Sequence, residues 1–431
     1  MKLFSIKHFA VILKPLLIGS VVFVGGCNAA SPTASPTAGS PNTSQGFSVQ
    51  RLSRIDDVMQ RYIQADKLVG TLSLVARNGE VVHLSANGMR DREAELPMTE
   101  DTIFRIYSMT KPITAVAALT LWEQGLFHMN DPIEKHLPEL KNLKVYVSGE
   151  GENMVVEDAE SLVTIKQLFL HTAGFSYGFT QSPVDKLYQE AFSKLTNTSS
   201  TQALETMASL PLNHQPGTKW HYGINTDIIG LLVERLTNKK LGEYMQEVIF
   251  TPLNMNDTGF YVKQENLTRF AQLYSPGDKG QTVVNENGML GSFTTDPAVH
   301  NGGGGLTSTI GDYYKFTQML LNGGELNGTR ILGRKTVQYL RSNHLPDDLI
   351  PFAPDAKGEG YGLAMSVTVD EDQVNFMSST GNFGWGGAAS TYFRIDPKEN
   401  MIMISMTQFL PMGFHPYHDD FRNAVYQALI D

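Results

Sequence analysis

Hydrophobic residues follow two different spacings in the first part of the chain, and each predicts one kind of element. Apolar positions three or four apart share one face of a helix, whereas alternating positions share one face of a strand. Helical spacing predicts a helix over residues 53–65, and the apolar stretches 69–77 and 81–86 flank Asn78-Gly79, a pair typical of a hairpin turn. The positions with helical spacing are Leu52, Ile55, Met59 and Tyr62.

The middle and the end of the chain differ in the same way. A helix is predicted from Ser108 to Gly125, and helical stretches and loops continue to about Asp312. Strand-like runs return only late, at 361–369, 388–395 and 401–407, before a last helix over 419–429. This order predicts an α+β fold: an antiparallel sheet from N- and C-terminal segments, flanked by helices, with an inserted, mainly helical lobe. A side chain between sheet and lobe would lie in a cleft, where functional sites are common.

The N-terminal segment has the pattern of an export signal. Three lysines precede an apolar run from Leu16 to Val24, which ends in two glycines and Cys27. A cysteine directly after two glycines resembles the bacterial lipobox, where cleavage leaves a lipid-modified cysteine at the new N-terminus. We therefore predict a lipoprotein signal peptide over 1–26 and lipidation of Cys27. An uncleaved anchor helix is the alternative, and the apolar run is short for one.

The segment after Cys27 is poor in residues that could build a core. Residues 27–46 are rich in Ser, Pro and Thr and repeat Ser-Pro-Thr-Ala, which predicts a flexible tether. The folded domain is then expected over 47–431. A lipid and a tether would hold it against a membrane after export across the inner membrane, on the periplasmic or cell-surface side.

Charge and cysteine content exclude several classes of function. The chain has 34 Lys and Arg against 44 Asp and Glu, a net charge of −10, so nucleic acid is not an expected partner. Its single cysteine is Cys27, which excludes disulfides within the chain and a thiol catalyst elsewhere.

Ser108 and Lys111 form a Ser-x-x-Lys motif at the start of a predicted helix. Residues three apart on a helix have Cβ atoms about 5–6 Å apart, so the lysine amine can reach the serine hydroxyl. A serine is a poor nucleophile until a neighbouring base activates it. This is the nucleophile motif of serine β-lactamases and penicillin-binding proteins. Taken alone, the pair is more often a helix N-cap and a solvated lysine than a catalytic pair.

Further stretches agree with this motif, in order along the chain. Residues 164–174 look like the helix and His-Thr-Ser-Gly turn of the β-lactamase-related family, and 216–225 resemble its stretch with a catalytic tyrosine, here Tyr222. Residues 302–309 and 384–388 resemble its late glycine run and its substrate strand. The sequence therefore resembles the serine β-lactamase-related family (class C β-lactamase and penicillin-binding protein fold), most closely the family VIII carboxylesterases.

The resemblance implies a role for each matching residue. Ser108 would attack an acyl carbonyl, and Lys111 would keep the local field positive, which favours a phenolate at Tyr222. Which of Lys111 and Tyr222 is the formal base stays open. The implied oxyanion hole consists of the backbone N–H groups of Ser108 and Ala388. No cofactor or metal is expected, and the expected partner is a small ester or acyl substrate.

Two departures from the family pattern concern the substrate. Trp385-Gly386-Gly387 stands where β-lactamases and DD-peptidases carry Lys-Thr-Gly, so the cation that meets a substrate carboxylate is missing. Burying an unpaired carboxylate is costly, which favours a neutral acyl group. Ile224 stands where an asparagine would bind an acylamido group, and Asn225 comes one place late. The implied substrate-binding residues are Trp385, Gly386, Gly387 and Asn225.

Two other motifs are set aside. Ser176 lies in a Gly-x-Ser-x-Gly stretch, but a nucleophile elbow needs a strand before it and a helix after it, and here a helix-like run precedes. His415 and His418 have metal-like spacing without a companion cysteine or His-Glu-x-x-His motif.

The sequence thus predicts a lipid-anchored, extracytoplasmic serine hydrolase. We expect a carboxylesterase that acts through a Ser108 acyl-enzyme on neutral short-chain esters. The alternatives are a β-lactamase or D-Ala-D-Ala carboxypeptidase and, from another class, a non-catalytic binding protein of the same fold.

Overall fold

The computed structural model describes residues 43–193, 198–286 and 288–431. The predicted signal peptide, Cys27 and most of the predicted tether lie outside these residues, so those assignments stay predictions. The described chain starts with strand β1 (Thr43–Ser44), which pairs with β2 (Phe47–Ser48). Regular structure therefore begins within the last residues of the segment predicted as a tether.

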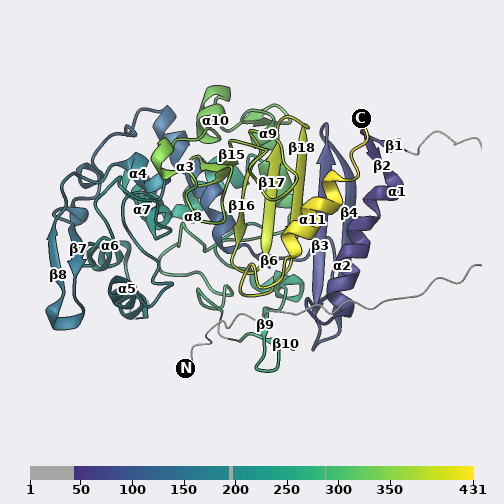
Figure 1. Ribbon diagram of the computed structural model, residues 1–431, viewed down its shortest axis with the longest axis horizontal. Helices are drawn as coiled ribbons and strands as arrows, with labels where there is room; N and C mark the ends of the chain where they lie inside the picture. The colour runs from purple at the N-terminus through teal and green to yellow at the C-terminus, as the bar shows by residue number, and fades with distance from the viewer. Residues whose placement is uncertain (1–42, 194–197, 287) are drawn as a thin grey trace, which may run out of the picture. The chain divides into compact units, whose positions relative to one another are not determined.

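The main sheet has eight antiparallel strands that come from both ends of the chain (Figure 1). The two ends meet where β18 pairs with β3, with Ile402 opposite Ala76. This arrangement confirms the predicted fold class. In order across the sheet, the strands are β14 (Glu359–Tyr361), β15 (Ser366–Thr368), β16 (Phe383–Gly387), β17 (Thr391–Asp396), β18 (Met401–Met406), β3 (Gly70–Arg77), β4 (Glu80–Asp91) and β5 (Leu96–Pro97).

Helices cover both faces of this sheet because its central strands are apolar on both sides. Met401 and Met403 of β18 belong to the core under helices α2 (Arg54–Gln64) and α11 (Tyr417–Tyr426). Ile402 and Ile404 belong instead to the larger core, which includes helix α9 (Ile310–Leu321). Successive strand residues point to opposite faces, so one continuous apolar run supplies two cores.

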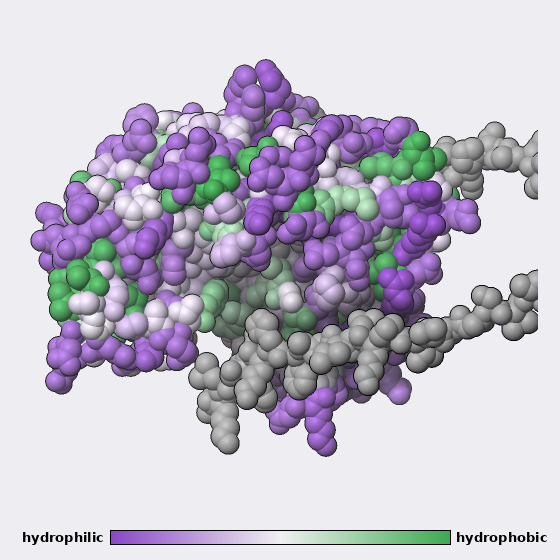
Figure 2. Space-filling view, in the orientation of Figure 1, coloured by the Kyte–Doolittle hydropathy of each residue, from purple (hydrophilic) through white to green (hydrophobic). Residues whose placement is uncertain are grey.

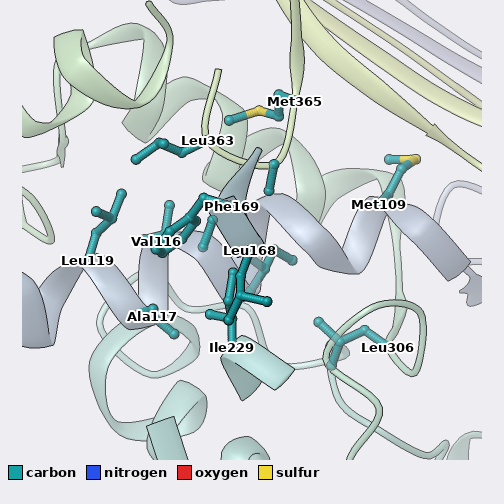
Figure 3. Packing of buried hydrophobic residues seen from close by; sticks show 14 of the residues in the cluster. Met109, Val116, Ala117, Leu119, Leu168, Phe169, Ile229, Leu306, Leu363 and Met365 are labelled. Atoms are coloured by element: carbon teal, nitrogen blue, oxygen red, sulfur yellow. The ribbon is translucent and has the colours of Figure 1, made fainter. Parts of the chain in front are cut away.

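Helix α3 (Thr110–Glu123) is the central helix of the inserted lobe. Its residues from Thr110 to Leu121 are buried, because small and apolar side chains occur all round it. Figure 3 shows Val116 and Leu119 of α3 in one packed cluster with Phe169 of helix α4 (Ile165–Phe169). In the part of the chain that the structure describes, no helix combines the length and hydrophobicity needed to cross a bilayer.

Further α-helices and two-stranded ribbons lie outside the main sheet. The remaining α-helices are α1 (Val49–Leu52), α5 (Pro183–Ser193), α6 (Ser200–Ala208), α7 (Asn225–Thr237), α8 (Leu241–Met245) and α10 (Arg334–Leu340). Two-stranded ribbons pair β6 (Phe104–Arg105) with β11 (Thr307–Ser308), β7 (Lys144–Ser148) with β8 (Val155–Asp158), β9 (Tyr274–Pro276) with β10 (Thr282–Val284), and β12 (Glu325–Leu326) with β13 (Thr329–Arg330).

Most predicted elements are present, with two corrections. The helix over 53–65 is α2, and the predicted hairpin is β3 and β4. The single strand predicted over 361–369 is wrong: it is the turn and second strand of the β14–β15 hairpin, and Ala364 in the turn has a φ of +63°. An apolar run does not reveal a turn whose left-handed residue is alanine. The strand predicted from Ala388 starts only at Thr391, because residues 388–390 form the turn from β16 to β17.

Candidate active site

Ser108 lies in a tight turn directly before α3. Residues Tyr107–Met109 form a 3₁₀ turn, so Ser108 precedes the α-helix and does not sit in its first turn as predicted. Tyr107 has a φ of +41°, a region that residues other than glycine rarely adopt. Such strain persists where the surrounding structure holds the residue in place, and it is common at functional sites.

The end of strand β16 packs against this turn. A Cβ on Gly387 would lie 2.3 Å from the carbonyl oxygen of Ile106, so only glycine allows the strand this close. Ala388 follows directly and accepts a hydrogen bond of 2.7 Å from Met412 N. Gly386, Gly387 and Ala388 therefore lie beside the Ser108 turn, while the oxyanion-hole role of the Ser108 and Ala388 amides stays a prediction.

Lys111 reaches the serine from the first turn of α3. Its Nζ donates to Ser108 Oγ over 3.2 Å and to the carbonyl oxygen of Gly303 over 2.7 Å. The side chain is fully buried, and its Nζ lies 4.7 Å from the ring centre of Tyr222 and 4.9 Å from that of Tyr177. Two aromatic faces and a carbonyl thus hold this cation in place of water.

Tyr222 completes the group at the nucleophile. It comes from the loop before α7, and its OH shares a hydrogen bond of 2.8 Å with Ser108 Oγ. Trp385 Nε1 lies 3.4 Å from the same phenol oxygen. The structure therefore brings together Ser108, Lys111, Tyr222 and Trp385, four of the residues predicted from the sequence.

Aromatic rings enclose Tyr222 on several sides. Their centroids lie 4.9 to 6.4 Å from that of Tyr222, which is the usual range for tilted or offset ring pairs. Such packing fixes where the phenol oxygen points. The rings belong to His171, Tyr177, Phe179, Trp220 and Trp385.

A buried carboxylate next to Lys111 is a feature that the sequence analysis missed. Asp227 is 4% exposed, accepts from Tyr177 OH over 2.9 Å and accepts from Gly303 N over 3.1 Å. Burial raises the pKa of Asp227, while the charge of Lys111 and these hydrogen bonds oppose the rise. A Cβ on Gly303 would lie 2.2 Å from Tyr177 OH, so the bridge between the aspartate and the lysine requires glycine.

Asp227→Asn should lower kcat by about 10–100-fold without unfolding the protein. The charges of Asp227 and Lys111 act on each other, and Gly303 joins the two residues: its carbonyl oxygen accepts from Lys111 Nζ and its N–H donates to Asp227. Steady-state kinetics would test this. Tyr177→Phe is the matched control, because it removes the hydrogen bond but keeps the charge, and it should cost less than about tenfold. Equal losses in both variants would show that the charge is not the cause.

The expectation that Asn225 contacts the substrate is corrected. Asn225 is the first residue of α7 and is fully buried, and its Nδ2 donates to His171 Nδ1 over 2.9 Å. Gly223 N donates to the same nitrogen over 3.3 Å. Burial and the charge of Lys111 hold the pKa of His171 well below its ordinary value, so this nitrogen stays an acceptor. Asn225 and His171 thus hold the loop that carries Tyr222.

The motifs set aside earlier lie in other surroundings. Ser176 is 1% exposed and donates to Asp185, with His221 Nε2 3.3 Å from its Oγ. The three residue types of a catalytic triad therefore meet, but the serine hydroxyl bonds the acid directly and is closed to solvent. His418 donates to the Ser390 carbonyl oxygen over 3.0 Å and stacks on Tyr392. Within the described chain no three His, Cys, Asp or Glu side chains are placed to share an ion.

Several proteins are similar in sequence to this chain over most of its length. This chain is 33% identical to Protein Rv1367c of Mycobacterium tuberculosis over 356 residues. The aligned region covers 80% of this chain and 87% of that protein. The chain is 28% identical over 390 residues to Esterase EstB of Burkholderia gladioli (87% and 95%). It is 30% identical over 403 residues to the lovastatin esterase of Penicillium rubens (86% and 98%).

Solved structures share the fold. EstCE1, described as a hydrolase with promiscuous acyltransferase activity, superposes with a TM-score of 0.76 at 24% identity, over 88% of this chain and 99% of that one. A penicillin-binding protein homologue from Pyrococcus abyssi superposes with a TM-score of 0.67 at 20% identity, over 87% and 77%. The Beta-lactamase family model matches residues 55–427. This chain therefore belongs to the beta-lactamase family, and it is a serine hydrolase.

Proposed function

We propose that this serine hydrolase is a carboxylesterase that acts through a Ser108 acyl-enzyme on neutral esters, short-chain esters included. One observation carries the proposal: Ser108 Oγ lies within hydrogen-bond distance of both Lys111 Nζ and Tyr222 OH, at 3.2 and 2.8 Å. A hydroxyl held between an amine and a phenol can pass its proton, as it attacks, to whichever of the two is deprotonated. The esterases among the relatives support the same reaction class.

The proposed reaction has two halves. Ser108 Oγ bonds to the ester carbonyl carbon while its proton passes to the base, either Lys111 or Tyr222. The bond between the carbonyl carbon and the alcohol oxygen then breaks as the base returns the proton to that oxygen, and the acyl group stays on Ser108. A water molecule attacks this acyl ester in the same way and releases the carboxylic acid, which regenerates the serine.

The preference for a neutral substrate rests on Trp385. Its indole lies beside Tyr222, on the strand where related enzymes of other specificity carry a lysine. An indole N–H can donate one hydrogen bond but brings no positive charge. A substrate carboxylate would therefore lose water there without gaining an ion partner.

Comparing two substrate classes tests the proposal directly. The purified protein should hydrolyse 4-nitrophenyl acetate and butyrate with kcat/KM well above that for a chromogenic cephalosporin. Faster turnover of the cephalosporin would favour the β-lactamase alternative instead. Release of D-alanine from a D-Ala-D-Ala peptide at a higher rate than either would favour the carboxypeptidase.

Trp385→Lys should shift this ratio. A lysine at 385 supplies the cation that a β-lactam carboxylate lacks, and a charged hydrogen bond is worth roughly 1.5–3 kcal/mol, or about one to two decades in kcat/KM. Hydrolysis of neutral esters should fall, because the indole contacts with the substrate and with Tyr222 are lost. An unchanged ester-to-lactam ratio would show that Trp385 does not set the specificity.

We also propose that the enzyme works at the cell envelope, anchored by a lipid on Cys27. The support is the sequence pattern of residues 1–46, which combines a basic start, an apolar run, Gly-Gly-Cys and a Ser/Pro/Thr-rich spacer. Expression with a labelled fatty acid should label the wild-type protein and not Cys27→Ala. Equal labelling of both would exclude this anchor.

A further inference from the structure

Three loops expose large apolar side chains around Ser108, and we propose that these side chains bind an ester whose alcohol and acyl halves are both large and apolar. The inference rests on the proposed esterase function and names its substrate class. Single exposed apolar residues are ordinary, but clustered ones mark binding surfaces. The side chains and their exposed fractions are Phe179 (61%), Leu290 (43%) and Met412 (46%).

Phe179 lies on the same side of the site as Tyr222. Its ring stacks on Tyr177, with centroids 5.1 Å apart and planes at 21°, and its centroid is 6.4 Å from that of Tyr222. The loop is held by Asp185, which accepts from Thr180 N over 2.8 Å. Phe179 is thus an exposed ring on a fixed loop, ready to cover a flat apolar group.

Leu290 lies against the backbone that carries the nucleophile. A Cβ on Gly304 would lie 3.0 Å from Leu290 Cδ1 and 3.7 Å from the carbonyl carbon of Tyr107. That carbonyl carbon is bonded to the amide nitrogen of Ser108. The exposed leucine and the backbone next to the Ser108 amide, which would hold the ester oxygen, therefore both lie against Gly304.

Met412 occupies the corresponding place at strand β16. A Cβ on Gly386 would lie 2.7 Å from Met412 Sδ, and Met412 N donates to the Ala388 carbonyl oxygen over 2.7 Å. The flexible thioether lies over the glycines of the strand and can adapt to chains of different shape. Leu290 and Met412 thus stand beside the two backbone positions of the predicted oxyanion hole.

The geometry of acyl transfer assigns each half of the ester to one of two apolar walls, Phe179 on one side and Leu290 with Met412 on the other. The attacked carbon carries four groups: Ser108 Oγ, the oxyanion, the alcohol oxygen and the acyl chain. The alcohol oxygen must face the group that returns its proton, Lys111 or Tyr222. Lys111 Nζ lies only 4.7 Å from the ring centre of Tyr222, so either donor directs the alcohol half towards Phe179. The acyl chain is left with the side away from Tyr222, along Leu290 and Met412.

Two ester series separate the walls. The first varies the acyl group of 4-nitrophenyl esters from acetate to hexanoate, below their critical micelle concentrations. The second compares phenyl acetate with 2-naphthyl acetate, whose leaving groups have similar acidity. For the wild-type protein we expect kcat/KM to rise about twofold per added methylene, and about fivefold from phenyl to naphthyl.

Variants should change one series each. Leu290→Ser combined with Met412→Ser should flatten the acyl series through KM, with a larger loss for hexanoate than for acetate. Met412→Leu should keep the slope, because it keeps the apolar wall. Phe179→Ser should abolish the naphthyl advantage and keep the acyl slope. The control is Val155→Ser, in strand β8, where Figure 2 shows another hydrophobic patch; Val155 is 52% exposed, and this change should alter neither series.

The outcomes distinguish this inference from the function on which it rests. If acetate is hydrolysed but kcat/KM is flat or falls along both wild-type series, the apolar walls do not bind substrate and the inference is wrong. The inference is also wrong if Val155→Ser changes the slopes as much as the Phe179, Leu290 and Met412 variants do. If no ester in either series is hydrolysed, the proposed esterase function itself fails.

Discussion

Ser108→Ala should lower kcat/KM for 4-nitrophenyl esters by about 10⁴-fold or more while the protein stays folded. The variant removes the atom that forms the acyl bond, so only the binding and polarisation of the ester remain. The hydroxyl is partly exposed and contributes little to the core, so the melting temperature should change little. Steady-state kinetics and thermal unfolding of the two proteins would measure both effects.

Ser176→Ala is the matched control for this change. Ser176 lies in the Gly-x-Ser-x-Gly stretch and is 1% exposed, with its Oγ bonded to Asp185 and to Gly178 N. Losing it leaves buried partners unpaired, which costs about 1–3 kcal/mol of stability. Activity per folded molecule should stay within about tenfold of wild type. Loss of activity in Ser176→Ala with activity retained in Ser108→Ala would exchange the roles of the two serines.

Lys111→Ala and Tyr222→Phe should each lower kcat by about 10²–10⁴-fold, the usual value of general-base assistance. The double variant should be little slower than the slower single variant. Both groups act on the one proton of Ser108 Oγ, from 3.2 and 2.8 Å, so removing either disables the same step. Single-turnover rates with a nitrophenyl ester would measure the chemical step without product release.

Lys111→Met controls for the cavity that alanine would leave around a fully buried side chain. It fills most of the volume without the charge, so it should be more stable than Lys111→Ala and equally inactive. If the losses in Lys111→Ala and Tyr222→Phe multiply in the double variant, the two residues act on separate steps. The shared proton transfer would then be excluded.

Ser108 and Lys111 could be predicted because their geometry is local. Side chains three positions apart in a helical turn lie on the same face whatever the rest of the fold does. The structure places Lys111 Nζ 3.2 Å from Ser108 Oγ. Tyr222 lies 114 residues further along the chain, so no spacing rule brings it to Ser108. Its meeting with the serine was predicted only through the resemblance to a family whose fold makes that contact.

Asp227 and Tyr177 could not be found in this way. Asp227 lies in the first turn of α7, where an acid is ordinary, so nothing in the sequence indicates that it has a buried partner. Tyr177 lay inside a stretch considered only for its serine. The network depends on Gly303, whose missing side chain lets Tyr177 and Asp227 approach Lys111, and such closeness is a property of the packed structure.

Asn225 shows why register matters at an element boundary. Read as a one-residue slip of a family motif, it was expected to bind the substrate. In the structure it starts α7, and a step of one residue on a helix turns the side chain by about 100°. Its amide therefore meets His171 behind Tyr222, which is a contribution to position and not to binding.

The acyl-enzyme on Ser108 is the central claim, and labelling with a fluorophosphonate tests it most directly. The reagent forms a stable bond only with an activated serine, so one equivalent should bind per molecule, and peptide mapping by mass spectrometry should place it on Ser108. Labelling should be lost in Ser108→Ala and strongly slowed in Lys111→Ala, while the buried Ser176 stays unmodified. A label on Ser176, or none on a protein that hydrolyses esters, would contradict the account.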